Sequence, residues 1–170
     1  MSTPAQPDRP LLLLDVDGVL LVVRSSWAEG ADDGLDLDVD LEPTLHPEAA
    51  EWLAELAEAF ELVWATTWEE MANRVIAPAL GLPALPAIEF DMDRRVPTAK
   101  LPSVIAWVGD RPCAWIDDDL WHDADTWAAG RAVPTLLVHV DMTEGMERRH
   151  VDRLLAFAAE LEHASEARPG

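Results

Sequence analysis

The sequence predicts an α/β fold, a single Rossmann-like domain in which a central parallel sheet of about five strands is flanked by helices. Short apolar runs alternate along the chain with segments of helical periodicity, which is the pattern of a parallel sheet connected by helices. The runs show no apolar-polar alternation, as expected of strands buried on both faces. A chain of 170 residues has room for one hydrophobic core.

The apolar runs that predict strands are distributed over most of the chain. They span residues 11–16, 62–65, 87–90, 113–116 and 135–140. Helices are expected at residues 48–60, 69–77, 102–108 and 147–163. The first helix is the clearest, because its apolar residues recur at helical spacing, glutamates occupy the opposite face and Pro47 suits its first turn.

Segments outside this pattern are polar or rich in proline. Residues 1–10 contain three prolines and predict a disordered lead, so the folded domain is expected over residues 11–165, with a short tail over 166–170. Residues 35–41 alternate strictly between apolar residues and Asp, which predicts a small flap hairpin with a solvated face. The alternative, a calcium loop, is disfavoured because Leu41 and Pro47 stand where that loop requires Gly and Glu.

The composition excludes several classes of protein. Lys and Arg number 12 against 33 Asp and Glu, a net charge of −21 that disfavours nucleic-acid backbones and anionic membranes as partners. An apolar content of 49% with eight Trp is too high for a disordered acidic tail. The single cysteine excludes an intrachain disulfide, and the apolar run near the N-terminus is too short for a signal peptide or membrane span. We therefore expect a soluble, cytoplasmic protein.

Four features with chemical potential fall where strands end or helices begin. They are the sequence Asp15-Val16-Asp17-Gly18, the pair Thr66-Thr67, the only lysine, Lys100, and the run Asp117-Asp118-Asp119. Taken singly, each has a simpler interpretation as a turn, a helix cap, a solvated lysine or an acidic loop.

Together these features indicate a cation site, because the carboxyl ends of parallel strands meet at one edge of the sheet. Carboxylates gathered there repel one another by about 4 kcal/mol per pair at close range, unless a cation lies among them. Hard oxygen ligands that are few in number favour Mg²⁺.

These residues and their order resemble the haloacid dehalogenase-like (HAD) hydrolase superfamily, most of whose members are Mg²⁺-dependent phosphatases. The first motif of that superfamily matches residues 15–18, the second matches Thr66, the third matches Lys100, and the fourth matches Asp117 and Asp118. The sequence around Thr66 and the lack of room for a full cap domain are similar to a small capless bacterial branch, linked in some cases to RNA repair proteins.

The resemblance implies a role for each matching residue. Asp15 is the expected nucleophile, which forms an aspartyl-phosphate and also binds the metal. Asp17 is the expected general acid and base, with its backbone carbonyl on the metal. Thr66 and Lys100 are expected to bind phosphoryl oxygens and to complete the catalytic set.

The resemblance also implies the surroundings of these residues. The expected metal ligands are Asp15, Asp17, Asp117 and Asp118, with Mg²⁺ as the cofactor. The expected phosphate-binding positions are Val16, Gly18, Thr66, Thr67 and Lys100. Which two of Asp117, Asp118 and Asp119 serve the metal stays open at this point.

The expected function is that of a phosphomonoester hydrolase acting on a phosphorylated substrate, as a monomer or homodimer. The alternatives are a non-catalytic or regulatory metal-binding module, and a phosphatase specialised for nucleic-acid ends. A phosphorelay receiver uses the same residue types, but in a different order along the chain. Trp68 and Trp121 follow strand ends and would suit stacking on a ring, although core packing is the favoured interpretation of both.

Overall fold

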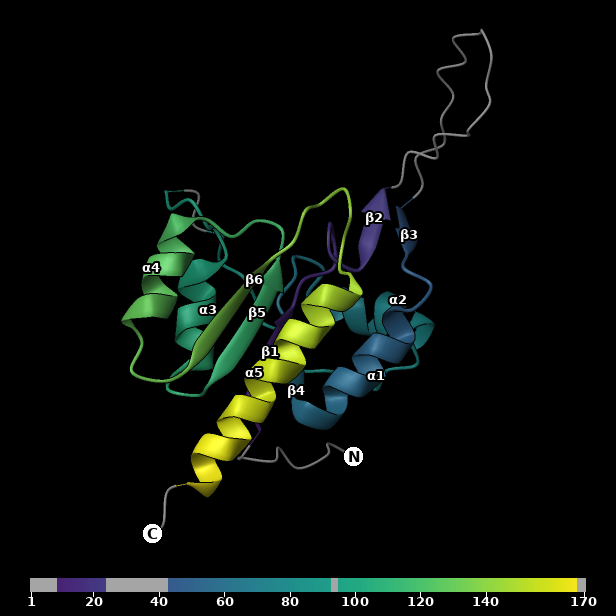
Figure 1. Cartoon of the computed structure of the whole chain (residues 1–170). Coiled ribbons are helices and arrows are strands. Elements are labelled where there is room, and N and C mark those ends of the chain that lie inside the picture. Colours follow the sequence, from purple (N-terminus) through teal and green to yellow (C-terminus); the bar gives the residue numbers. More distant parts are fainter. Residues whose placement is uncertain (1–8, 24–42, 93–94, 168–170) are drawn as a thin grey trace, which may run out of the picture.

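The computed structural model of the chain describes residues 9–23, 43–92 and 95–167. Its centre is a parallel sheet with the strand order β4-β1-β5-β6 (Figure 1). The strands are β1 (Leu11–Leu14), β4 (Glu61–Trp64), β5 (Cys113–Asp117) and β6 (Thr135–His139). The predicted α/β class is confirmed, and four of the expected strands form the sheet.

The fifth expected strand, at residues 87–90, is reduced to one bridge between Ala87 and Trp64. Beyond this bridge, side chains accept hydrogen bonds from the backbone N–H groups. Phe90 N donates to Glu69 Oε1 at 3.2 Å, and Asp91 N donates to Ser103 Oγ at 3.2 Å. The apolar run therefore leaves the sheet edge instead of continuing along β4.

Five helices surround the sheet among the described residues. They are α1 (Ala49–Ala59), α2 (Glu70–Ala79), α3 (Leu101–Val108), α4 (His122–Gly130) and α5 (Arg148–Glu166). The four predicted helices are confirmed within a few residues at their ends. α4 was not predicted from the sequence, because its only fully buried residue is Ala124 and it lacks a clear apolar stripe.

The sheet is buried on both faces, which explains why its strands read as continuous apolar runs. Leu12 and Leu14 pack in one cluster with residues of α1, α2 and α5, whereas Leu11 and Leu13 pack in a second cluster with α3 and α4. Figure 1 shows α1 and α5 on one side of the sheet and α3 and α4 on the other. The result is a three-layer α/β/α arrangement with two half-cores.

A small antiparallel hairpin follows β1, as expected. β2 (Leu21–Val23) pairs with β3 (Pro43–Leu45) beyond the carboxyl edge of the sheet (Figure 1). The alternating residues 35–41 lie outside the described residues, as does most of the predicted N-terminal lead. Among the described helices, none has the length and apolar character needed to cross a bilayer.

Candidate functional site

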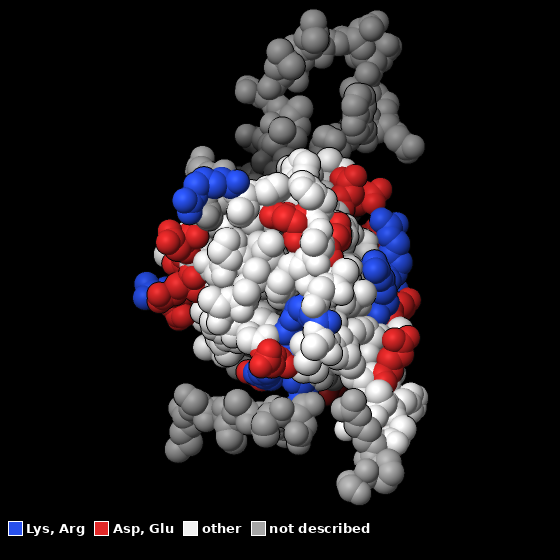
Figure 2. Space-filling view, turned by 90° about the vertical axis from the view of Figure 1, so that its left-hand side faces the viewer, with Lys and Arg blue, Asp and Glu red and all other residues white. Residues whose placement is uncertain are grey.

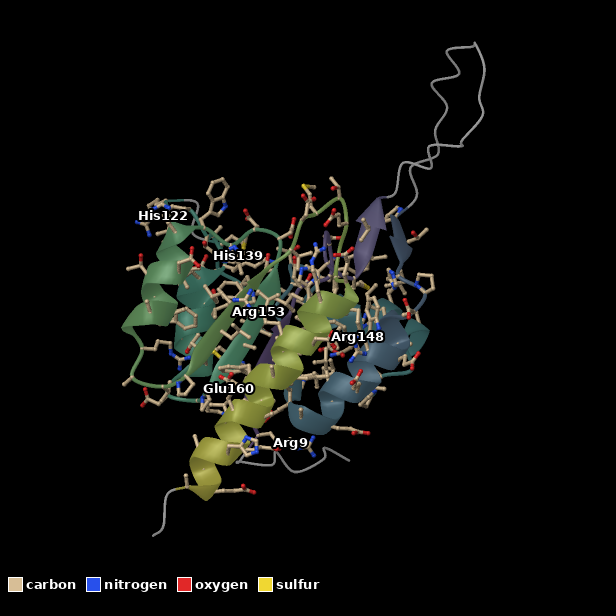
Figure 3. All side chains as sticks on the ribbon, viewed as in Figure 1. Arg9, His122, His139, Arg148, Arg153 and Glu160 are labelled. Carbon is tan, nitrogen blue, oxygen red and sulfur yellow. The ribbon has the colours of Figure 1, made fainter. Side chains whose placement is uncertain are left out.

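The predicted site lies at the carboxyl edge of the sheet. In Figure 3, His139 at the end of β6 and His122 at the start of α4 lie toward this edge. On the face shown in Figure 2, acidic side chains gather near the corresponding upper end, among uncharged ones. All four strands run in the same direction, so the loops after β1, β4 and β5 meet here.

Three carboxylates converge at this edge. Asp15, Asp117 and Asp118 each place an oxygen within 4.8 Å of the others. The register explains the convergence, because Leu14 of β1 pairs with Ile116 of β5, and the residues after this pair are Asp15 and Asp117. Asp15 is 4% exposed, Asp117 is fully buried and Asp118 is partly exposed. This cluster contains three of the four predicted metal ligands.

Lys100 bridges two members of the cluster. Its Nζ lies 2.9 Å from Asp15 Oδ1 and 2.8 Å from Asp117 Oδ2, and the residue is 8% exposed. Burial alone would lower the pKa of Lys100, but the charges of Asp117 and Asp15 outweigh it and raise that pKa. The only lysine of the chain is therefore held as an ammonium group at the centre of the predicted site.

When it is fully ionised, the cluster carries more negative charge than Lys100 balances. Burial raises the pKa of Asp15 to about 8, the charge of Asp117 adds to the rise, and Lys100 only partly opposes it. Burial and Asp117 also raise the pKa of Asp118. With all three carboxylates ionised, the cluster and Lys100 together carry two net negative charges, which is the charge that one divalent cation balances.

Asp117 has a different environment from the other two carboxylates. Its Oδ2 accepts hydrogen bonds from Lys100 Nζ and from Trp115 Nε1 at 3.1 Å, and its Oδ1 accepts one from Asp119 N at 2.9 Å. Both oxygens of Asp117 are thus engaged and hold Lys100 in place, whereas Asp118 is partly exposed to solvent. Trp115 was not predicted as a site residue, although it lies two positions before Asp117 and hence on the same side of the strand.

The loop before α3 positions Lys100. Thr98 donates to the Asp123 carboxylate from its N at 3.0 Å and from its Oγ1 at 2.6 Å, and Thr98 Oγ1 accepts from Trp121 N at 2.9 Å. Although burial opposes the effect, the hydrogen bonds from Thr98 lower the pKa of Asp123. Neither Thr98 nor Asp123 was predicted, because their contact joins residues far apart in the sequence.

Gly18 allows the first motif to approach the fourth. Its φ is +73°, a conformation that favours glycine, and a Cβ at this position would lie 2.7 Å from Asp118 Cγ. Asp17 lies outside the cluster, and its Oδ2 accepts a hydrogen bond from Trp68 Nε1 at 2.8 Å. The exposed carboxylate of Asp17 is therefore oriented by a tryptophan that follows β4.

The second motif lies beside the first. Ala65 N donates to Leu14 O at 2.7 Å, which ties the end of β4 to the end of β1 directly before Thr66. Thr66 is fully buried and its Oγ1 accepts from Trp68 N at 3.3 Å, whereas Thr67 is exposed. The Val16 side chain is buried in the core, which leaves only its main chain to face a ligand.

Asp119 is the member of the acidic run that lies outside the cluster. Its Oδ1 accepts a hydrogen bond from Trp121 Nε1 at 2.7 Å. The structure thus groups Asp117 and Asp118 with Asp15 and turns Asp119 toward an aromatic side chain. Trp121 is 55% exposed, so the expectation of core packing was wrong for this residue, whereas Trp68 does pack against the core.

Comparisons with known proteins agree with this geometry at the level of the family. Residues 11–151, which include all four motifs, match the family described as the HAD domain in Swiss Army Knife RNA repair proteins. The comparison with curated proteins finds no match.

Two solved structures are similar at low sequence identity. An uncharacterised protein from Listeria monocytogenes serotype 4b is 12% identical with a TM-score of 0.47, over 88% of this chain and 99% of that one. A Vibrio cholerae protein with the provisional name 3-deoxy-D-manno-octulosonate 8-phosphate phosphatase is 15% identical with a TM-score of 0.45, over 92% of this chain and 87% of that one. Because the family match covers most of the sequence, this chain belongs to the family of HAD domains found in Swiss Army Knife RNA repair proteins.

Proposed function

We propose that this chain is a Mg²⁺-dependent phosphomonoester hydrolase that acts through an aspartyl-phosphate on Asp15. The observation that carries the proposal is the buried cluster of Asp15, Asp117 and Asp118 with Lys100 bonded between two of them. A structural ion pair needs one carboxylate for one ammonium. This site has surplus carboxylates at the edge of the sheet where ligands of parallel α/β proteins bind.

The donor set fits Mg²⁺. It offers only carboxylate oxygens from Asp15, Asp117 and Asp118. Both oxygens of Asp117 already accept hydrogen bonds, so Asp15 and Asp118 are the better candidates to bind the ion. A bound Mg²⁺ would balance the charge of the cluster, favour ionised Asp15 and polarise a phosphoryl oxygen. Asp17 would add its backbone carbonyl, while its side chain stays free of the cluster.

The proposed reaction has two steps. In the first, a carboxylate oxygen of Asp15 attacks phosphorus, the bond from phosphorus to the leaving oxygen breaks, and Asp17 gives that oxygen its proton. In the second, Asp17 takes a proton from water as the water oxygen attacks the same phosphorus, and the bond to Asp15 breaks. Phosphate leaves, and both carboxyl groups return to their starting states.

The surrounding residues support these steps. Lys100 lies 2.9 Å from the nucleophile and is placed to offset charge on the phosphoryl group. Trp68 Nε1 holds the carboxylate of Asp17 on the exposed side, where a leaving group or water reaches it. Thr66, at the end of the adjacent strand, would donate its hydroxyl to a phosphoryl oxygen.

The test is hydrolysis of a panel of phosphomonoesters by the purified protein, with Mg²⁺ and with a chelator. Activity is expected only with Mg²⁺, and Asp15→Asn should lower it by about a thousandfold or more. Acid quenching during turnover should leave a phosphate mass on the peptide that contains Asp15. Asp152→Asn, at an exposed carboxylate on α5, is the matched control and should retain activity. Equal activity of Asp15→Asn and wild type would exclude the proposed nucleophile.

A phosphatase specialised for nucleic-acid ends is the second candidate, and the description of the family favours it. The net charge of −21 opposes it, because long nucleic acids would be repelled. Phosphorylated oligonucleotides belong in the same panel as mononucleotides. A clear preference for the oligonucleotides would favour this candidate, whereas Mg²⁺ binding without any hydrolysis would indicate a regulatory module.

A further inference from the structure

We infer that the leaving group of the substrate carries a flat ring, which stacks on Trp121 at the mouth of the site. This inference rests on the proposed function, because it names the class of substrate for the same site. It concerns small phosphomonoesters with an aromatic ring or nucleobase, as opposed to open-chain or sugar phosphates.

The two most exposed large apolar residues of the described chain both lie at the carboxyl edge of the sheet. Trp121 after β5 is 55% exposed, and Met142 after β6 is 63% exposed. Met142 Cβ lies 3.1 Å from the position that a Cβ on Gly18 would take, so it borders the first motif. Trp121 is connected to the cluster through Asp119, so its exposed indole is available there to contact an apolar part of a ligand.

Trp121 makes hydrogen bonds through its side chain and through its backbone despite its exposure. Its Nε1 donates to Asp119 Oδ1 at 2.7 Å, and its backbone N donates to Thr98 Oγ1 at 2.9 Å. These partners belong to the same two loops as the cluster, since Asp119 N donates to Asp117 and Thr98 lies two residues before Lys100. The hydrogen bonds link the backbone and the indole of Trp121 to the loops that hold Asp117 and Lys100, which favours one orientation of the indole for a ring to stack on.

The chemistry of the exposed surface favours stacking over hydrogen bonding. The single donor of the indole is already taken by Asp119, so the remaining ring surface of Trp121 offers apolar contact. A flat ring matches this surface, as aromatic side chains stack on rings of many kinds.

The charges at the mouth restrict the rest of the ligand. The carboxylates of Asp17 and Asp118 are partly or fully exposed beside the site, and Asp119 lies next to Trp121. They oppose a leaving group that carries further phosphates. A small monoester with a neutral ring satisfies both constraints.

The experiment compares four substrates with Mg²⁺: phenyl phosphate, adenosine 5′-monophosphate, ribose 5-phosphate and glycerol 3-phosphate. Trp121→Leu should lower kcat/KM for the two substrates with an aromatic ring, phenyl phosphate and adenosine 5′-monophosphate, about tenfold more than for the two without an aromatic ring. Trp121→Phe keeps an aromatic ring, so it should retain most of the wild-type preference for the substrates with an aromatic ring. The control is Trp107→Leu, which changes another partly exposed tryptophan near the far end of α3 and should leave the ratio between substrates unchanged.

The outcomes separate the inference from the proposed function. An equal loss for all four substrates in Trp121→Leu overturns the inference and leaves the phosphatase intact. A loss confined to the nucleotide or to phenyl phosphate supports the inference and identifies the kind of ring. If wild type hydrolyses none of the four, the wider panel of phosphomonoesters still tests the phosphatase proposal, and equilibrium binding of the four compounds decides the inference. Tighter binding of ring compounds that requires Trp121 supports the inference, and equal binding of all four overturns it.

Discussion

Two regions of this molecule gather charged side chains, and they differ in how the charges are balanced. At the start of α5, Arg148 binds Glu55 through NH1 at 2.7 Å and Asp152 through Nε at 2.7 Å, with all three side chains exposed. At the sheet edge, three carboxylates gather around Lys100, and two of them are almost fully buried. The charges of the first region are exposed to water, whereas most of those at the sheet edge are buried.

The difference indicates which acidic residues have a functional role in this strongly acidic chain. Exposed ion pairs contribute little to stability, so the ion pairs at the start of α5 need no functional explanation. Burying carboxylates in excess of cations costs stability, and such a cost is characteristic of sites that bind a charged ligand. Changes at the sheet edge should therefore affect activity and metal binding far more than changes at the exposed ion pairs of α5.

After the loss expected for the nucleophile, replacing the buried cation with a larger one should cause the greatest loss. We expect Lys100→Arg to lower kcat about a hundredfold, because the planar guanidinium does not fit the enclosed space in which one ammonium contacts Asp15 and Asp117. The matched exchange Arg148→Lys at the start of α5 should leave kcat unchanged. Steady-state kinetics on an aryl phosphate measure both, and comparable losses in the two variants would remove the distinction between the regions.

Separating the first motif from the fourth is expected to have the next largest effect. Gly18→Ala places a Cβ 2.7 Å from Asp118 Cγ, which should displace that carboxylate and lower kcat at least tenfold. Gly81→Ala is the control, since Gly81 also has a positive φ, of +68°, but no atom lies within 4 Å of its added Cβ. Both changes add backbone strain of about 1 kcal/mol, so only the contact with Asp118 distinguishes them. Equal activity of the two variants would show that the position of the Asp118 carboxylate does not matter for activity.

Magnesium should stabilise the protein in a pH-dependent way. The Asp15 pKa is about 8 in the folded chain and 3.8 as its ordinary value, so between these values the folded state keeps a proton that the unfolded state releases. The contribution of Asp15 to stability is therefore present at low pH and is lost as pH rises toward 8. If Mg²⁺ binds the ionised cluster as proposed, it should raise Tm more at pH 8 than at pH 5.

Thermal melts with Mg²⁺ and with a chelator measure this effect. Asp118→Asn should weaken the response to Mg²⁺, whereas Asp152→Asn should leave it unchanged because Asp152 lies in the exposed pairs of α5. A Tm that is independent of Mg²⁺ at both pH values would count against a metal site at the sheet edge.

The sequence predicted the sheet well because its strands are buried on both faces, which leaves continuous apolar runs at β1, β4, β5 and β6. The run at 87–90 contains Glu89 between apolar residues and forms only one bridge, since Glu69 and Ser103 accept hydrogen bonds from the backbone N–H groups that follow. Those side chains come from other parts of the chain, so no local pattern predicts them. α4 was missed for the opposite reason, as a mostly exposed helix has little apolar periodicity.

The same limits apply to the site. Asp15, Lys100, Asp117 and Asp118 were predicted because strand ends meet at one edge and the motifs occur in a known order. The contacts that hold them were not predicted. Trp115 could have been identified from its position two residues before Asp117, whereas Thr98 and Asp123 meet only through the packing of two loops.

A smaller effect is expected from the one histidine buried in the α5 region. His150 Nδ1 accepts a hydrogen bond from Glu147 N at 3.0 Å, and burial and then the charge of Arg149 lower the pKa of His150 below 6.5. The unfolded chain therefore takes up this proton at a higher pH than the folded chain, and stability should fall as pH decreases below about 6.5. His150→Gln keeps a hydrogen-bond acceptor but removes the group that titrates. The Tm of the variant relative to that of wild type should therefore be higher at pH 5 than at pH 7. A difference that does not change with pH would contradict this assignment.

The smallest effect is expected at the exposed ion pairs themselves. Arg148→Ala removes the contacts to Glu55 and Asp152, yet both partners are solvated and lose little when the cation is gone. We expect a small decrease in Tm at low ionic strength that vanishes at about 0.5 M NaCl, because salt screens exposed charges. Catalytic activity and the stabilisation by Mg²⁺ should be the same as in wild type. A large decrease in Tm that persists in salt would show that the α5 region, like the sheet edge, depends on charges held away from water.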